Sequence, residues 1–170
     1  MAARSIAVLL ILLAGSASAE ERCQQFWSST VQRIELFADY LPTVASTQSL
    51  PREGVFSLTL QPADEVIYLV APERGRAVGL GGGHGGIVTI EGIAAGRYYV
   101  ALSDAAWIEA VQDDRRLPVF AEAHGSSCPN VRQSLEIAVE SRPLTLQIGG
   151  ARTDRVSIGI LRIWPAEWRW

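Results

Sequence analysis

The chain has 170 residues, a formal net charge of -3, and fifteen basic residues that are all arginine. The lack of lysine excludes Schiff-base chemistry and lysine general bases, apart from the α-amino group. The mild acidic charge gives no electrostatic reason to expect nucleic acid or an anionic lipid surface as a partner.

Residues 1–19 have the pattern of a secretory signal peptide. Arg4 supplies the positive charge, residues 6–13 (IAVLLILL) form a short apolar run, and Ala17 and Ala19 give the small-residue cleavage pattern. The run is shorter than the roughly 20 residues that cross a bilayer, and no second run follows. We expect cleavage after Ala19 and a periplasmic or secreted mature chain without a transmembrane segment. Loss of the positive Arg4 would change the charge from -3 to -4. The alternative is a retained N-terminal anchor.

Residues 20–53 are expected to form an N-terminal arm and linker ahead of the folded domain. Pro42 and Pro51 indicate a loop or linker over residues 43–53. Apolar residues within 24–41 fit one amphipathic helical stripe: Val31, Ile34, Leu36, Phe37, Tyr40 and Leu41.

The two cysteines are Cys23, in the arm, and Cys128, far downstream. In an oxidising compartment we expect one disulfide that ties the arm to the domain. The alternative is two separate thiols that act as metal ligands.

From Gly54 onward the sequence changes to short β-type runs separated by turn residues. Residues 55–60 (VFSLTL) alternate, which predicts a strand with Phe56, Leu58 and Leu60 on one face. Residues 66–71 (VIYLVA) are apolar throughout, which predicts a strand covered on both sides. Further strands are expected at 87–90, 97–103, 107–111, 135–139, 144–148 and 156–163. This spacing predicts one all-β domain over residues 54–163, an antiparallel β-sandwich or jelly roll, followed by a tryptophan-rich tail at 164–170.

Three sequence blocks carry a family resemblance. They are residues 94–108 (AAGRYYVALSDAAWI), residues 124–128 (HGSSC) and residues 144–148 (LTLQI). In this order they resemble a family of small exported bacterial proteins with the pattern AGxYxVALSxxAWI…HGxxC, over roughly residues 54–163. Some members of that family carry the name homogentisate 1,2-dioxygenase, which implies a non-haem iron enzyme.

The chain departs from the family pattern in two places. Glu122-Ala123 stands where members often have His-Gly, and Asn130-Val131 stands where Gly-Ile is usual. More loosely, residues 96–100 (GRYYV) are similar to accessory β-sandwich domains attached to secreted bacterial enzymes.

An iron(II) oxygenase site needs two imidazoles and one carboxylate on one face of the metal. The chain has two histidines, His84 and His124, so both would have to bind iron, with Glu122 as the nearest carboxylate. On a strand Glu122 and His124 would point to the same side, whereas His84 would come from the glycine run at 79–86. The same residues could hold zinc or copper. We favour the alternative in which His84 lies on a turn and His124 pins a loop beside Cys128.

Other catalytic motifs are missing from the sequence. A phosphate-binding P-loop ends in Gly-Lys-Ser/Thr, which a chain without lysine cannot supply. No Gly-x-Ser-x-Gly nucleophile motif is present. Ser103-Asp104 is typical of a turn after a strand, and the acidic pairs Asp64-Glu65 and Asp113-Asp114 also fall at turns.

Aromatic residues give the remaining lead. We expect Trp168, Trp170 and Tyr98 as candidate ligand-surface residues, with a tail folded back over the sandwich as the alternative for the tryptophans. Trp107 is expected in the core.

Together these observations favour an exported β-sandwich that acts as a non-catalytic binding or interaction module. The expected partner is a protein or a glycan, and no cofactor is expected. The alternatives are a small iron-dependent oxidoreductase, as the family resemblance implies, and a carbohydrate-binding module.

Overall fold

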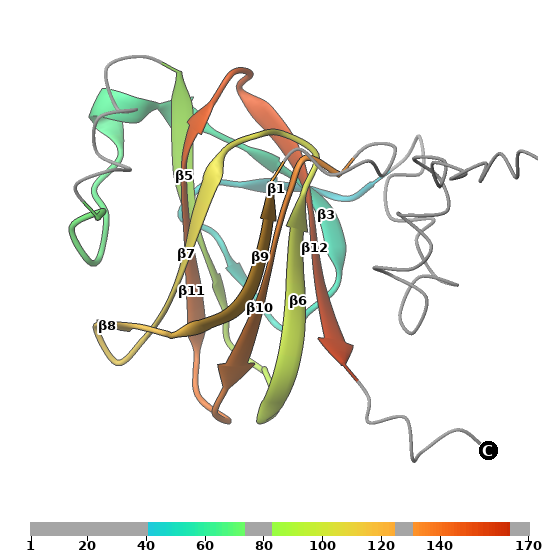
Figure 1. Cartoon of the computed structure of the whole chain (residues 1–170). Coiled ribbons are helices and arrows are strands. Elements are labelled where there is room, and N and C mark those ends of the chain that lie inside the picture. The colour runs from blue at the N-terminus through green and yellow to red at the C-terminus, as the bar shows by residue number, and fades with distance from the viewer. Residues whose placement is uncertain (1–40, 74–82, 125–130, 164–170) are drawn as a thin grey trace, which may run out of the picture.

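The computed structural model describes residues 41–73, 83–124 and 131–163, which form two six-stranded sheets packed face to face (Figure 1). Sheet A has the order β1 (Thr43–Ala45), β3 (Val55–Thr59), β12 (Arg155–Ile163), β6 (Gly96–Leu102), β10 (Gln133–Val139) and β9 (Val119–His124). Sheet B has the order β2 (Ser49–Leu50), β5 (His84–Ile90), β11 (Leu144–Ala151), β7 (Trp107–Gln112) and β8 (Arg115–Arg116), with β4 (Gln61–Pro62) also paired to β5. A short 3-10 helix, η2 (Ala63–Glu65), follows β4.

The strand order is that of a jelly roll. Its central strands are β3-β12-β6-β10 in one sheet and β5-β11-β7-β8 in the other, and the chain passes between the sheets at most connections. All pairs among these central strands are antiparallel. The predicted all-β sandwich is therefore confirmed.

The segment expected as a linker contributes two strands instead. β1 pairs in parallel with β3 in sheet A, and β2 pairs in parallel with β5 in sheet B. Val44 of β1 is only 5% exposed and belongs to the core. The linker prediction for this stretch is wrong because burial of Val44 and the backbone hydrogen bonds of both strands attach it to the sheets. Both sheets are consequently mixed rather than purely antiparallel.

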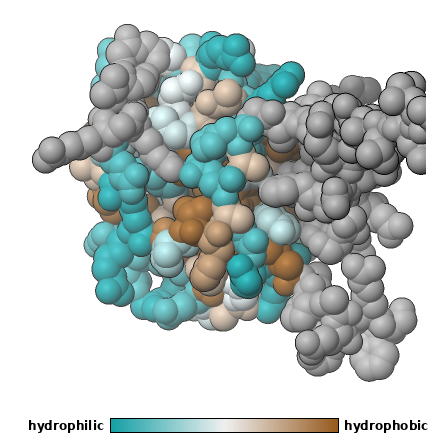
Figure 2. Space-filling view, in the orientation of Figure 1, coloured by the Kyte–Doolittle hydropathy of each residue, from teal (hydrophilic) through white to brown (hydrophobic). Residues whose placement is uncertain are grey.

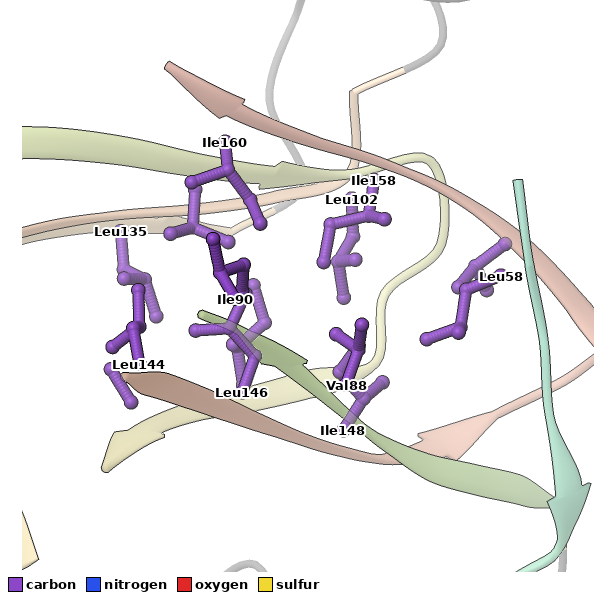
Figure 3. Close-up of a cluster of buried hydrophobic side chains, with 14 of the residues drawn as sticks. Leu58, Val88, Ile90, Leu102, Leu135, Leu144, Leu146, Ile148, Ile158 and Ile160 are labelled. Carbon is purple, nitrogen blue, oxygen red and sulfur yellow. The ribbon is translucent and has the colours of Figure 1, made fainter. Parts of the chain in front are cut away.

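The core lies between the two sheets and is filled by branched aliphatic side chains (Figure 3). Phe56, Leu58 and Leu60 all point into it, with exposed fractions of 3%, 0% and 5%, which confirms the predicted face of this strand. From the other sheet, alternate residues of β11 supply Leu144, Leu146 and Ile148. The period-2 pattern of the sequence is thus realised on both sides of the core.

Residues 66–71 do not form the doubly covered strand that their composition predicts. Residues 66–73, here called the strap, run without strand structure, and Ile67 and Leu69 are 90% and 53% exposed. The prediction is wrong because the backbone of Val70 is hydrogen-bonded to the side chain of Gln147 rather than to a neighbouring strand.

Several predictions concern residues outside the described ranges. They are the signal peptide at 1–19, the helical stripe up to Tyr40, Cys23 and Cys128, the first half of the glycine run (79–82), and Trp168 and Trp170 in the tail. In the parts of the chain that are described, no helix has the length and hydropathy needed to cross a membrane.

Candidate functional site

Three connections meet at one end of the sandwich, here called the loop end. They are residues 103–106 between β6 and β7, residues 152–154 between β11 and β12, and residues 131–132 ahead of β10. The strand register places the end of β6 beside the start of β10, because Leu102 pairs with Gln133. Loops held by a rigid sandwich are common positions for binding residues, so this end is the first place to look for a site.

An open depression of about 420 Å³ lies at the loop end. It is lined by Ser103, Asp104, Arg132, Arg152 and Thr153, which come from all three connections. The five lining residues are all of polar or charged types, unlike those of the aliphatic core.

Asp104 lines the depression and joins two of the connections. Its side chain is 11% exposed. Oδ1 accepts a hydrogen bond from Ala105 N at 2.6 Å, and Oδ2 accepts one from Arg152 N at 3.1 Å. Arg152 Nε lies 3.6 Å from Oδ1. These contacts compensate the carboxylate charge and hold the β6–β7 and β11–β12 connections together.

The two hydroxyl groups of the lining have complementary roles. Ser103 Oγ accepts a hydrogen bond from Ser157 N at 2.9 Å, so its own proton is available to a ligand. Thr153 Oγ1 donates to Arg155 O at 2.8 Å and presents lone pairs instead. The depression therefore offers one hydroxyl donor and one hydroxyl acceptor beside the guanidinium groups.

The predicted metal ligands Glu122 and His124 lie together, at the end of β9. His124 Nε2 is 3.3 Å from Glu122 Oε1, as expected for residues two apart on a strand. The same oxygen accepts a hydrogen bond from Gln133 Nε2 at 2.8 Å. The imidazole is largely exposed, and the pair lies at the edge of sheet A.

His84 begins β5 of sheet B, where it pairs with Ala151 and Pro62. Its Nδ1 atom is buried and has no hydrogen-bond partner within the described ranges. No group of three His, Cys, Asp or Glu side chains in the described residues is close enough to hold a metal ion. The predicted site of His84, His124 and Glu122 is therefore not assembled among the described residues, where Glu122 and His124 end β9 of sheet A and His84 begins β5 of sheet B. These residues do not fit the iron centre that the family resemblance implies.

The prediction that Tyr98 forms a ligand surface is also wrong. Its side chain is 0% exposed, and its hydroxyl donates to Ala94 O at 3.0 Å. Alternation along β6 turns Tyr98 toward the core together with Val100 and Leu102.

Trp107 lies outside the core, on the outer face of sheet B. Its ring packs against Tyr68 of the strap, with centroids 5.3 Å apart and an interplanar angle of 47°. Burial, and secondarily the negative charge of Glu109, raises the pKa of the Tyr68 hydroxyl to about 12. The expected core position of Trp107 is thus replaced by a position under the strap.

A polar network fixes the strap to this face. Arg116 Nε lies 2.9 Å from Glu109 Oε2, and Glu109 Oε1 accepts a hydrogen bond from Glu73 N at 3.1 Å. The carboxylate of Glu109 is almost fully buried. Since the Glu109 carboxylate contacts both the strap and Arg116 of the sheet, we assign this network to structure rather than to ligand binding.

Four large apolar side chains are exposed among the described residues: Ile67, Leu69, Val119 and Phe120. Figure 2 shows small groups of apolar atoms surrounded by polar ones on the face that carries β9. Phe120 is partly covered by Arg97, whose guanidinium carbon lies 4.5 Å from the ring centroid.

No protein-family model, curated protein or solved structure matches this chain. The family resemblance drawn from the sequence therefore stays a prediction, and function has to be inferred from the residues of the loop end.

Sequence reasoning missed the residues of the depression. The sequence predicts a turn at Ser103-Asp104, and the hydrogen bond from Ala105 N to the Asp104 side chain agrees with a turn. Arg132 and Arg152 lie twenty residues apart in the chain and belong to no motif. The available signal was positional: both arginines flank predicted strands, and a jelly roll brings alternate connections to the same end.

Proposed function

We propose that this chain is an exported, non-catalytic β-sandwich module that binds a ligand in the depression at the loop end. The observation that carries the proposal is the depression itself, in which three connections present charged and hydroxyl groups around a fixed aspartate. Preorganised polar groups in a concave site are what small-ligand recognition requires.

The composition of the lining supports binding over catalysis. None of the five described residues that line the depression is histidine, cysteine or lysine. Ser103 has no imidazole beside it in that lining to act as a general base, and its oxygen already accepts a backbone hydrogen bond. Asp104 is committed to two backbone amides.

The location outside the cytoplasm is part of the proposal and rests on the leader pattern of residues 1–19. N-terminal sequencing of the chain recovered from the periplasm or the culture medium tests it. A mature N-terminus at Glu20 is expected, and a chain that still begins at Met1 in the cytoplasm would overturn this part.

Ligand binding is tested by screening the mature chain against glycans and small organic ligands by calorimetry and thermal shift. The bound ligand is expected to lose affinity in Arg152→Ala, while Arg142→Ala, at the opposite end of the sandwich, binds normally. A screen without any ligand, or a ligand whose affinity is the same in both variants, would overturn the proposal.

The oxidoreductase alternative has its own measurement. Iron content and oxygen uptake with homogentisate and added iron(II) are expected to show neither stoichiometric iron nor turnover. Stoichiometric iron that is lost in His124→Ala, together with turnover, would show that the chain is an enzyme and not a non-catalytic binding module.

A further inference from the structure

We propose that the depression at the loop end recognises a carboxylate carried by a polyhydroxylated ligand, as in an acidic sugar. This inference rests on the proposed function and specifies its ligand class. It is argued from the charge, the hydrogen-bonding groups and the shape of the depression.

The charge of the lining is positive although the chain as a whole is acidic. Arg132 and Arg152 contribute two positive charges and Asp104 one negative charge, which leaves +1 in a chain of net charge -3. The Asp104 carboxylate is already engaged by the amides of Ala105 and Arg152. The surplus guanidinium charge therefore faces whatever enters the depression, and it favours an anion.

Two exposed guanidinium groups line the depression. Arg152 turns its Nε toward Asp104, at 3.6 Å from Oδ1, which holds the base of the guanidinium while the side chain stays 79% exposed. Arg132 is likewise exposed, and its backbone N donates a hydrogen bond to Leu102 O at 2.9 Å. Two terminal NH₂ groups of one arginine match the two oxygens of a carboxylate, so a carboxylate fits this arrangement.

The hydroxyl groups account for the polyhydroxylated part of the ligand. The Ser103 proton is available to a ligand oxygen, and the Thr153 lone pairs are available to a ligand hydroxyl. A simple anion would use the arginines and leave Thr153 without a partner from the ligand. A uronate uses both kinds of group, because its ring carries hydroxyls next to the carboxylate.

The test compares D-glucuronate and D-galacturonate with their neutral parents, D-glucose and D-galactose, by titration calorimetry on the mature chain. Acetate and inorganic sulfate serve as further probes. An oligouronide distinguishes the end of a polysaccharide from a free acidic sugar. The uronates are expected to bind about 10-fold or more tightly than the neutral sugars, as for a hydrogen bond to a charged group. Their affinity should fall at higher salt concentration.

Variants assign the binding to the depression. Arg132→Ala and Arg152→Ala are each expected to weaken uronate binding by about 10-fold. Arg142→Ala removes the same charge at the opposite end and should leave the affinity unchanged. Arg132→Ala is the more conservative of the two arginine variants, because Arg152 also contacts Asp104, and circular dichroism confirms that each variant folds.

The outcomes separate this inference from the proposed function. Equal binding of glucuronate and glucose would overturn the inference that the depression recognises a carboxylate. So would Arg152-dependent binding of a screened ligand that has no carboxylate. In both cases the proposed function as a binding module remains. Sulfate or acetate that binds as well as the uronates means an adventitious ion only and also overturns the inference. Absence of any ligand in the wider screen overturns both.

Discussion

The side-chain amide of Gln147 binds both backbone polar groups of Val70. Its Oε1 accepts from Val70 N at 2.8 Å, and its Nε2 donates to Val70 O at 2.9 Å. Gln147 is fully buried in β11, so one side chain takes the place of a neighbouring strand for this point of the strap. The apolar run of residues 66–71 can thereby lie on sheet B without becoming part of it.

Replacing Gln147 by alanine should release the strap. Loss of the amide leaves the N–H and C=O of Val70 without their partners, at a cost of about 2 to 3 kcal/mol in unfolding free energy. Limited proteolysis should then cut within residues 66–73, and urea denaturation should report the lost stability. Thr145→Val, two residues away on the same face, removes only a 3.1 Å contact to the Thr89 hydroxyl and should leave the strap protected. A strap equally protected in Gln147→Ala would contradict this role of the amide.

Gly149→Ala should destabilise the fold. A Cβ at this position would lie 2.7 Å from the Tyr68 hydroxyl and would also press on the Trp107 ring. Overpacking of this kind costs typically about 1 to 3 kcal/mol. Gly54→Ala is the matched control, because a Cβ at Gly54 meets nothing within 4 Å. Thermal unfolding of the two variants should differ clearly, and equal melting temperatures would argue against the close approach of Tyr68 and Trp107 to the sheet.

Tyr68 should make stability depend on alkaline pH. Its pKa is raised from 10.0 to about 12 in the folded chain, because burial and Glu109 disfavour the phenolate. The neutral phenol prevails in both states below pH 10, and between pH 10 and 12 the unfolded chain ionises first. Stability due to this group is therefore complete below pH 10 and falls as pH rises toward 12.

The comparison of the original chain with Tyr68→Phe isolates this effect from the other tyrosines. Urea denaturation between pH 9 and 11.5 should give a shallower decline in the phenylalanine variant, and absorbance of tyrosinate should show one fewer late-titrating group. At neutral pH the variant should lose only the 3.1 Å hydrogen bond to Ile148 O, about 1 kcal/mol. Identical slopes for both proteins would show that Tyr68 titrates normally.

Asp114→Gly should stabilise the β7–β8 hairpin. Gln112 pairs with Arg115, so Asp113 and Asp114 form a two-residue loop, and their φ angles are 49° and 57°. Such a loop favours glycine at its second position because a side chain there costs about 1 kcal/mol or more. The expected gain is about 1 kcal/mol by thermal or urea unfolding. Asp113→Gly should gain less, since it also removes the ion pair with Arg142; the opposite ranking would contradict this account.

Much of the fold could be predicted because alternation is a local signal. The face of β3 that carries Phe56 and Leu58 follows directly from the sequence, as do the positions of β5, β6, β7, β10, β11 and β12 but not that of the short β8. The strap was mistaken for a strand because its composition cannot reveal that Gln147, far along the chain, binds its backbone. The small strands β1 and β2 were missed because short parallel pairs at sheet edges depend on tertiary contacts rather than on pattern.

The candidate site could be predicted less well, for the same reason. Histidines attract attention in a sequence, but the fold assigns His84 and His124 to separate sheets. Arginines and turn residues do not stand out, yet the fold collects Arg132, Arg152 and Asp104 around one depression. Which residues share an end of the sandwich is decided by topology, and no local motif records it.

The position of β12 has a consequence for when the molecule can fold. This strand is the last one described along the chain, yet it lies in the middle of sheet A, between β3 and β6. Until β12 has been synthesised, β3 and β6 have no strand between them that joins them into one sheet. The two parts of sheet A, β1-β3 and β6-β10-β9, can therefore be joined into one sheet only after β12 has been synthesised.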